Sequence, residues 1–247
     1  MLAPAQPIRR APPPWLHTVT DIHAVAGFAE PISSWTHLAG AGTFLYLGLR
    51  QLPRRRTGQR RAPARFAAFV VFGIATVVQL ALSGVYHLLE SPSAARPVLQ
   101  LLDHAAIFVL IAASITAANG MLFSGPWRWG MITAAWVTCA LGISLKMVFF
   151  AEAAEWLGLV SYFAMGMLGL ATLIELWRRH GRVFVAPLLG GGLVYTVGAL
   201  LEFLRVPVLV PGVFGPHELL HVSVLIALTM HWRFFQSVLD GFEPPAP

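Results

Sequence analysis

The sequence predicts an all-α membrane protein, built as a seven-transmembrane-helix bundle. The first observation is composition: the 247-residue chain is 57% hydrophobic and only 11% charged, whereas a soluble domain averages about 25% charged residues. So few charges cannot cover a water-facing surface, and a soluble enzyme is therefore disfavoured. The second observation is that seven separate stretches reach the length of about 20 mostly apolar residues that crossing a bilayer requires.

The seven apolar stretches follow one another with short connections rich in proline, glycine or arginine. They cover residues 34–52, 66–89, 98–121, 129–150, 156–177, 183–203 and 217–235. Before them, residues 1–33 are expected to form a tail with prolines and arginines, then an interfacial helix anchored by Trp15 and Phe28. The transmembrane domain is expected to occupy 34–235, and a short C-terminal tail to occupy 236–247.

Basic residues are clustered, which bears on membrane orientation. The chain has 17 basic and 11 acidic residues, and 16 of the basic residues are arginines. With seven crossings, twelve arginines fall on the face of the loop over 53–63 and four on the face of the N-terminus. Because cytoplasmic loops carry the excess of arginine and lysine, this count places the N-terminus outside and indicates no nucleic-acid partner. The preference for arginine over lysine suggests a bacterial protein, so we expect the bacterial cytoplasmic membrane.

Ionisable residues inside the spans collect at one end of the predicted bundle. Alternating the direction of the spans puts these residues on the face of the N-terminus: Glu30, His37, His87, Asp103, Lys146, Glu152, Glu155, Glu202, His217, Glu218 and His221. Ionisable groups at membrane depth are costly, so they are usually paired or functional. We therefore expect one polar site within a single leaflet.

Three histidines in this set have the spacing of metal ligands. His217 and His221 are four residues apart, so both imidazoles project from one helix face and can hold one ion. Ser83 and His87 repeat this spacing and add a third imidazole and a hydroxyl, while Asp103 can orient a ligand or a bound water. Three neutral imidazoles suit Zn²⁺, with a fourth position open to water. Hydrogen bonding without a metal remains the alternative for the histidine pair.

Two other patterns are weighed and set aside. The single Cys139 excludes an internal disulfide and a zinc site built from cysteines. HELLH at 217–221 matches the zinc-peptidase pattern, in which Glu218 is the general base, and LDG at 239–241 is similar to the aspartate motif of intramembrane site-2 proteases. These two motifs lie at opposite ends of one span, roughly 30 Å apart at about 1.5 Å per residue. Asp240 therefore cannot reach the histidines, and an intramembrane protease is disfavoured.

Seven short pieces of the chain match a known family in their order and in their placement on the spans. They are EPISSWTH (30–37), SGVYHLL (83–89), LDHAAIF (102–108), GISLK (142–146), YFAMG (162–166), LGGGLVYTVG (189–198) and PHELLHVSVL (216–225). The chain thus resembles the hemolysin III branch of the progestin and adipoQ receptor family, which includes the adiponectin receptors. The resemblance covers about residues 26–236.

The resemblance implies a seven-helix bundle with zinc near one membrane face. It implies that His87, His217 and His221 bind the zinc, that Asp103 holds the zinc-bound water and that Ser83 lies beside it. The wider superfamily includes alkaline ceramidases, which implies hydrolysis of a lipid amide with Asp103 as proton acceptor and donor. The resemblance also implies a cytoplasmic N-terminus, opposite to the arginine count, and both orientations stay open.

Three functions follow as alternatives. The favoured one is a zinc-dependent, ceramidase-like hydrolase acting on a lipid amide within the membrane. The second is a non-enzymatic membrane receptor or lipid-sensing protein with structural zinc, which is less favoured because structural zinc usually has four protein ligands. The third is a pore-forming cytolysin, which is disfavoured because no span carries a repeated polar stripe to line a channel. In each case membrane lipids are the expected partners.

Overall fold

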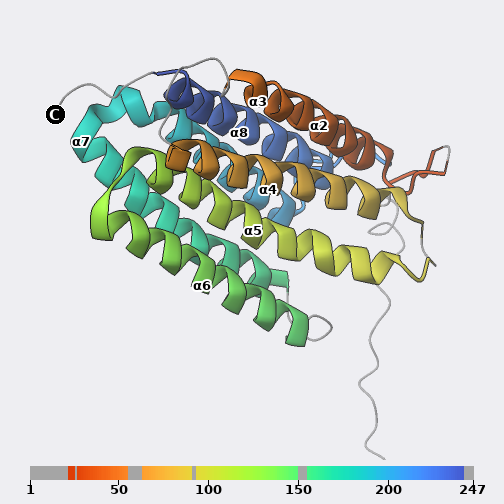
Figure 1. Cartoon of the computed structure of the whole chain (residues 1–247). Helices are drawn as coiled ribbons and strands as arrows, with labels where there is room; N and C mark the ends of the chain where they lie inside the picture. The colour runs from red at the N-terminus through yellow and green to blue at the C-terminus, as the bar shows by residue number, and fades with distance from the viewer. Residues whose placement is uncertain (1–21, 26, 55–62, 91–92, 150–154, 242–247) are drawn as a thin grey trace, which may run out of the picture.

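The computed structural model describes residues 22–25, 27–54, 63–90, 93–149 and 155–241. Within these residues the secondary structure is helical apart from turns and two isolated β-bridges. The helices are α2 (Pro31–Leu49), α3 (Gln51–Arg54), α4 (Pro63–Leu88), α5 (Arg96–Leu122), α6 (Gly125–Phe149), α7 (Glu155–Leu204) and α8 (Pro216–Leu239). The predicted all-α bundle is thereby confirmed, and Figure 1 shows its long helices running roughly alongside one another.

Five of these helices are long and apolar enough to cross a membrane: α4, α5, α6, α7 and α8. This number differs from the seven spans expected, for two reasons. The first is α2, whose 19 residues include Ser33, Ser34 and His37 and therefore have a lower hydropathy. The second is that the fifth and sixth expected spans follow each other without a loop and count as one element, α7, which is kinked at Gly181. The structure thus supports a multi-pass helical membrane bundle.

α7 is a 50-residue element that runs along the bundle twice. The expected loop over 178–182 is helical in the structure, apart from Gly181, which has φ 79° and ψ 169°; glycine tolerates this positive φ without steric cost. The first part of α7 ends where the guanidinium of Arg179 lies 4.9 Å from the ring centroid of Phe123, just after α5. The second part returns to Glu202, close to the start of α8.

The centre of the bundle is an aromatic core around Trp232 of α8. Its indole is 2% exposed, and its ring centroid lies 5.1 Å from that of Phe44, 4.9 Å from that of Phe69 and 6.0 Å from that of Phe72. Phe44 lies on α2 and Phe69 and Phe72 lie on α4, so these rings join α2, α4 and α8. α4 lies between α2 and α5, as Figure 1 shows. By contrast, many large apolar side chains on the outer faces of α6 and α7 are exposed, as expected of surfaces that contact lipid.

The chain before α2 forms a turn that covers one end of the bundle. Val25 and Phe28 exchange two backbone hydrogen bonds, and the ring of Phe28 packs edge-on against Trp35 at 5.2 Å. In the described part, 22–25 and 27–30, this turn replaces the interfacial helix that the sequence suggested; Trp15 lies outside the described residues. The backbone N–H of Ala29 donates to the carbonyl of Leu88 at 3.2 Å. This turn, which we call the N-terminal strap, therefore meets the end of α4.

Close approach of α2 and α4 depends on Gly84. A Cβ at this position would lie 2.7 Å from Cγ of Leu38 and 3.0 Å from its backbone nitrogen, and the Ser34 hydroxyl donates to the Gly84 carbonyl at 2.8 Å. We expect Gly84→Ala to destabilise the protein by about 1–3 kcal/mol through overpacking, measured as thermal unfolding in detergent. Gly42→Ala is the control, since nothing lies within 4 Å of a Cβ there. Equal stability of Gly84→Ala and wild type would contradict the close packing.

Candidate metal centre

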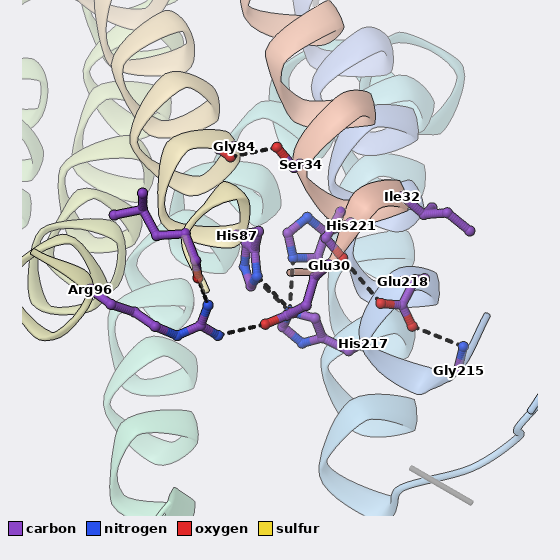
Figure 2. Close-up of polar contacts among 12 residues, drawn as sticks. Glu30, Ile32, Ser34, Gly84, His87, Arg96, Gly215, His217, Glu218 and His221 are labelled. Atoms are coloured by element: carbon purple, nitrogen blue, oxygen red, sulfur yellow. Dashed lines mark hydrogen bonds and ion pairs between the residues drawn. The ribbon is translucent and has the colours of Figure 1, made fainter. Parts of the chain in front are cut away.

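Three histidines from two helices converge at the end of the bundle under the N-terminal strap. His87 lies in the last turn of α4, and His217 and His221 lie in the first turns of α8, which begins at Pro216. Nε2 of His217 is 3.4 Å from Nε2 of His87 and 3.1 Å from Nε2 of His221. One ring nitrogen from each residue lies within 4.8 Å of the other two. Figure 2 shows the three rings pointing toward one another, so this histidine cluster could hold a metal ion.

The donor set of the histidine cluster fits a small tetrahedral ion. Nitrogen ligands that bind zinc at about 2.0–2.1 Å with tetrahedral angles lie about 3.3 Å apart, and the two Nε2 separations of 3.1 and 3.4 Å match this value. His87 and His221 are buried, and His217 is partly exposed. Unprotonated imidazole nitrogens at this separation repel one another unless a proton or a cation lies between them, so the cluster is suited to a cation.

A carboxylate fixes the orientation of the His87 ring. Oε2 of Glu30 lies 2.7 Å from Nδ1 of His87, and Oε1 of Glu30 accepts a hydrogen bond from Nη2 of Arg96 at 2.7 Å. Burial raises the pKa of the Glu30 carboxyl, but the hydrogen bond with His87, the positive charges of His87 and His217 when protonated, and the hydrogen bond with Arg96 outweigh this and hold the pKa at about 2. An ionised carboxylate only accepts hydrogen bonds. Nδ1 of His87 therefore carries the proton, and Nε2 presents its lone pair to the cluster.

The ring of His217 has a carboxylate of its own. Nδ1 of His217 lies 3.4 Å from Oε1 of Glu202 near the end of α7, and the same oxygen accepts a hydrogen bond from Nη1 of Arg205 at 2.8 Å. This arrangement favours a proton on Nδ1 of His217 and leaves Nε2 free for the cluster. Metal-binding histidines commonly donate their second ring nitrogen to a carboxylate in this way.

Asp103 lies on α5 with its carboxylate held by α4. Nε2 of Gln79 donates to Oδ1 of Asp103 at 3.0 Å, and the Ser83 side chain is also hydrogen bonded to Asp103. All three side chains are buried. Gln79 and Ser83 precede His87 by eight and four residues, so all three side chains lie on the same face of α4. The structure thus places Ser83 and His87 on one face of α4, with Asp103 of α5 hydrogen bonded to Ser83.

Glu218, the acidic residue of HELLH, holds the start of α8 and points away from the histidine cluster. Its Oε2 accepts the backbone N–H of Gly215 at 2.8 Å, and its Oε1 accepts the hydroxyl of Ser33 at 3.2 Å. The first contact is the carboxylate half of a capping box, and Figure 2 shows the side chain turned toward Gly215. Asp240 lies just after the far end of α8. The arrangement of the described residues therefore agrees with setting the protease pattern aside.

Other ionisable residues of the predicted polar site have packing roles or lie elsewhere. His37 stacks on His221 with ring centroids 4.0 Å apart, and its Nε2 lies 3.4 Å from the His221 carbonyl oxygen. His231 uses Nε2 to bond the carbonyl of Leu188 at 3.1 Å, far along α8 from the cluster. Lys146 lies on α6, opposite Gly158 of α7. Glu152 lies outside the described residues.

Sequence reasoning missed two residues and gave no role to two others. Gln79 was not predicted, although its spacing of four residues before Ser83 is the signal that placed Ser83 with His87. Arg96 was counted only as a loop charge, because nothing in the sequence links it to Glu30. Glu30 and Glu202 were placed at the correct end of the bundle but were not paired with a histidine.

Removing the Glu218 carboxylate tests its capping role. We expect Glu218→Ala to lower the free energy of unfolding by about 0.5–2 kcal/mol, the usual cost of losing a cap, while binding of a divalent metal is retained. Glu218→Gln is the matched control, because its amide oxygen can still accept the Gly215 N–H and stability should mostly return. Thermal unfolding and metal content measured on both variants decide the matter. Loss of metal in Glu218→Ala at unchanged stability would instead favour the peptidase-type role.

Comparison with known proteins identifies the family of the chain. The family described as haemolysin-III related matches residues 27–232. Hemolysin-3 of Bacillus cereus is 29% identical over 133 residues, 54% of this chain and 60% of that protein. The Hemolysin-3 homolog of Bacillus subtilis (strain 168) is 26% identical over 133 residues, 54% of this chain and 62% of that protein. The chain thus spans about three fifths of the length of these relatives. Since the family match covers most of its length, this multi-pass integral membrane protein belongs to the haemolysin-III related family.

Proposed function

We propose that this protein is a zinc-dependent hydrolase that cleaves a lipid amide, such as ceramide, within the bacterial cytoplasmic membrane. The observation that carries the proposal is the convergence of His87, His217 and His221 within 4.8 Å at the end of a membrane bundle. Asp103 adds a buried carboxylate on the neighbouring helix. A cluster of three imidazoles leaves one tetrahedral position open, which is typical of catalytic rather than structural zinc.

The proposal includes seven crossings of the membrane. Five helices satisfy the length and hydropathy of a span, and α7 supplies two crossings because it reverses at Gly181. α2 supplies the remaining crossing, and its polar residues face the interior: Ser33, Ser34 and His37 are all 3% exposed or less. This count places the N-terminus and the histidine cluster on the same face of the membrane.

Zinc at the histidine cluster would supply Lewis-acid chemistry: it polarises a carbonyl oxygen and lowers the pKa of water to about 7. The side chains of the protein supply the rest. Asp103 takes the proton of the attacking water and delivers it to the amine nitrogen as the amide C–N bond breaks, giving a fatty acid and an amine. Gln79 and Ser83 hold the Asp103 carboxylate in place during both transfers.

An amphiphilic substrate suits the surroundings of the site. Exposed apolar side chains occur on two segments that lead into it: Val98 and Leu102 on α5, within two turns of Asp103 in the chain, and Leu209 and Val213 in the segment before α8. Exposed apolar surface beside a polar site favours a ligand with an apolar part. A lipid lying in the membrane can therefore present its amide to the site while its chains stay in the bilayer.

Metal analysis tests the first step of the proposal. We expect about one zinc per wild-type chain by mass spectrometry and little zinc in His217→Ala, because two imidazoles bind far more weakly than three. Chelation should also lower the melting temperature of the wild type, since zinc that binds only the folded state adds to stability. His231→Ala is the control, because this α8 histidine bonds the Leu188 carbonyl and its loss should leave zinc in place. Equal zinc content in the wild type and in His217→Ala would show that the histidine cluster is not the zinc site.

Turnover tests the second step. Release of fatty acid from ceramide by zinc-loaded protein in detergent should fall about 10²–10⁴-fold in Asp103→Asn, the range of general acid–base catalysis, while zinc content stays the same. Gln79→Leu should give a smaller loss, because it only frees the Asp103 carboxylate. If zinc-loaded wild type released no fatty acid from any lipid amide tested, a receptor or lipid-sensing role with structural zinc would replace the hydrolase.

A further inference from the structure

We infer that two carboxylates anchored by arginines, Glu30 and Glu202, are positioning residues that orient His87 and His217 and set the affinity of the site for zinc. This inference rests on the proposed function, because it requires the histidine cluster to bind zinc. Each carboxylate contacts Nδ1 of one ring, Glu30 that of His87 and Glu202 that of His217. Oε2 of Glu30 also lies 3.6 Å from Nε2 of His217, which is longer than its 2.7 Å contact with His87.

Glu30 is fixed to His87 through both its side chain and its backbone. Its Oε2 lies 2.7 Å from Nδ1 of His87, and its backbone N–H donates to the backbone carbonyl of the same histidine at 3.1 Å. The adjacent Ala29 N–H donates to Leu88. The position of the carboxylate is therefore defined relative to the ring that it contacts, and the N-terminal strap cannot shift without moving Glu30 off His87.

Arg96 prevents the Glu30 carboxylate from turning away. Its Nη2 donates to Oε1 at 2.7 Å, its Nη1 donates to the Leu89 carbonyl, and its guanidinium lies 4.8 Å from the ring centroid of Tyr86. The guanidinium thus spans from α5 to the end of α4. With one carboxylate oxygen held by Arg96, the other is left for His87 (Figure 2).

Glu202 repeats this arrangement at the second ring in a weaker form. Its Oε1 contacts Arg205 at 2.8 Å and Nδ1 of His217 at 3.4 Å, which is 0.7 Å longer than the 2.7 Å contact of Glu30 with His87. Arg205 is more exposed than Arg96, with side-chain exposures of 54% and 22%. The third ring, His221, has an aromatic neighbour, His37, in place of a carboxylate. The effect on zinc affinity should therefore be larger for Glu30 than for Glu202.

The two carboxylates are expected to strengthen zinc binding by the rings that they contact. A carboxylate on Nδ1 selects the tautomer whose Nε2 is free to bind, and it strengthens that nitrogen as a ligand by partly accepting the Nδ1 proton. Losing such a partner typically costs 10–100-fold in metal affinity. The arginine holds the carboxylate in place, so neither the ring nor its partner needs to reorganise when the ion binds.

The test is the dissociation constant of zinc, measured by competition with a chromogenic chelator on the purified full-length protein in detergent. We expect Glu30→Gln to raise it about 10–100-fold and Glu202→Gln to raise it less. Glu175→Gln is the matched control: Glu175 also pairs with an arginine, Arg179, at 2.7 Å, but it contacts no histidine of the cluster and should not change the constant. Cobalt(II) gives a second readout, because its visible absorption reports the ligand geometry and should change in Glu30→Gln.

The outcomes separate this inference from the proposed function. If the wild-type protein bound no zinc, both the proposed function and this inference would be wrong. Wild type that binds zinc, with Glu30→Gln and Glu202→Gln of the same affinity and the same cobalt spectrum, would overturn the positioning role alone. A lower melting temperature of both variants without metal, at unchanged zinc affinity, would likewise assign the carboxylates to the fold. Weaker zinc binding at an unchanged metal-free melting temperature would support the inference.

Discussion

The contact among the three imidazoles of His87, His217 and His221 is the constraint on which the rest of this structure depends. It joins the last turn of α4 to the first turns of α8, helices separated by more than a hundred residues in the chain. Polar groups at the end of a membrane bundle need partners within the protein. The strap before α2, the start of α5 and the end of α7 accordingly bring their polar side chains to this one place.

α2 shows how the fold serves the site. Its polar residues lower its hydropathy, yet each has a partner: Ser33 bonds Glu218, Ser34 bonds the Gly84 carbonyl and His37 stacks on His221. These contacts need α2 to lie close to α4, which a side chain at Gly84 would prevent. The same closeness places Glu30 against His87. The packing of α2 against α4 and the orientation of the His87 ring therefore depend on each other. A change that moves α2 away from α4 would also move Glu30 away from His87.

Local spacing in the sequence predicted much of the site, and long-range pairing was beyond it. The pairs His217/His221 and Ser83/His87 follow from helix geometry, and alternation of the spans placed Asp103 and the glutamates at the same end. Pairing Arg96 with Glu30, or Glu202 with His217, depends on how helices meet, which no spacing reveals. The two spans within α7 were expected to be joined by a loop over 178–182, but arginines are good helix formers, and the helix is interrupted only at Gly181. The role of Glu218 in HELLH could not be predicted from the sequence, because its partner, the Gly215 N–H, depends on the local structure at the start of α8.

The distribution of charge explains how a dication site can exist at the end of a membrane bundle. Each carboxylate beside a ring has its own arginine, Glu30 with Arg96 and Glu202 with Arg205, so both pairs are close to neutral before any ion binds. An unpaired buried carboxylate would be costly in that state. The buried Asp103 carboxylate has neutral partners instead, the side chains of Gln79 and Ser83. A dication bound at the histidine cluster would offset part of the cost of this buried charge, which fits the role proposed for Asp103.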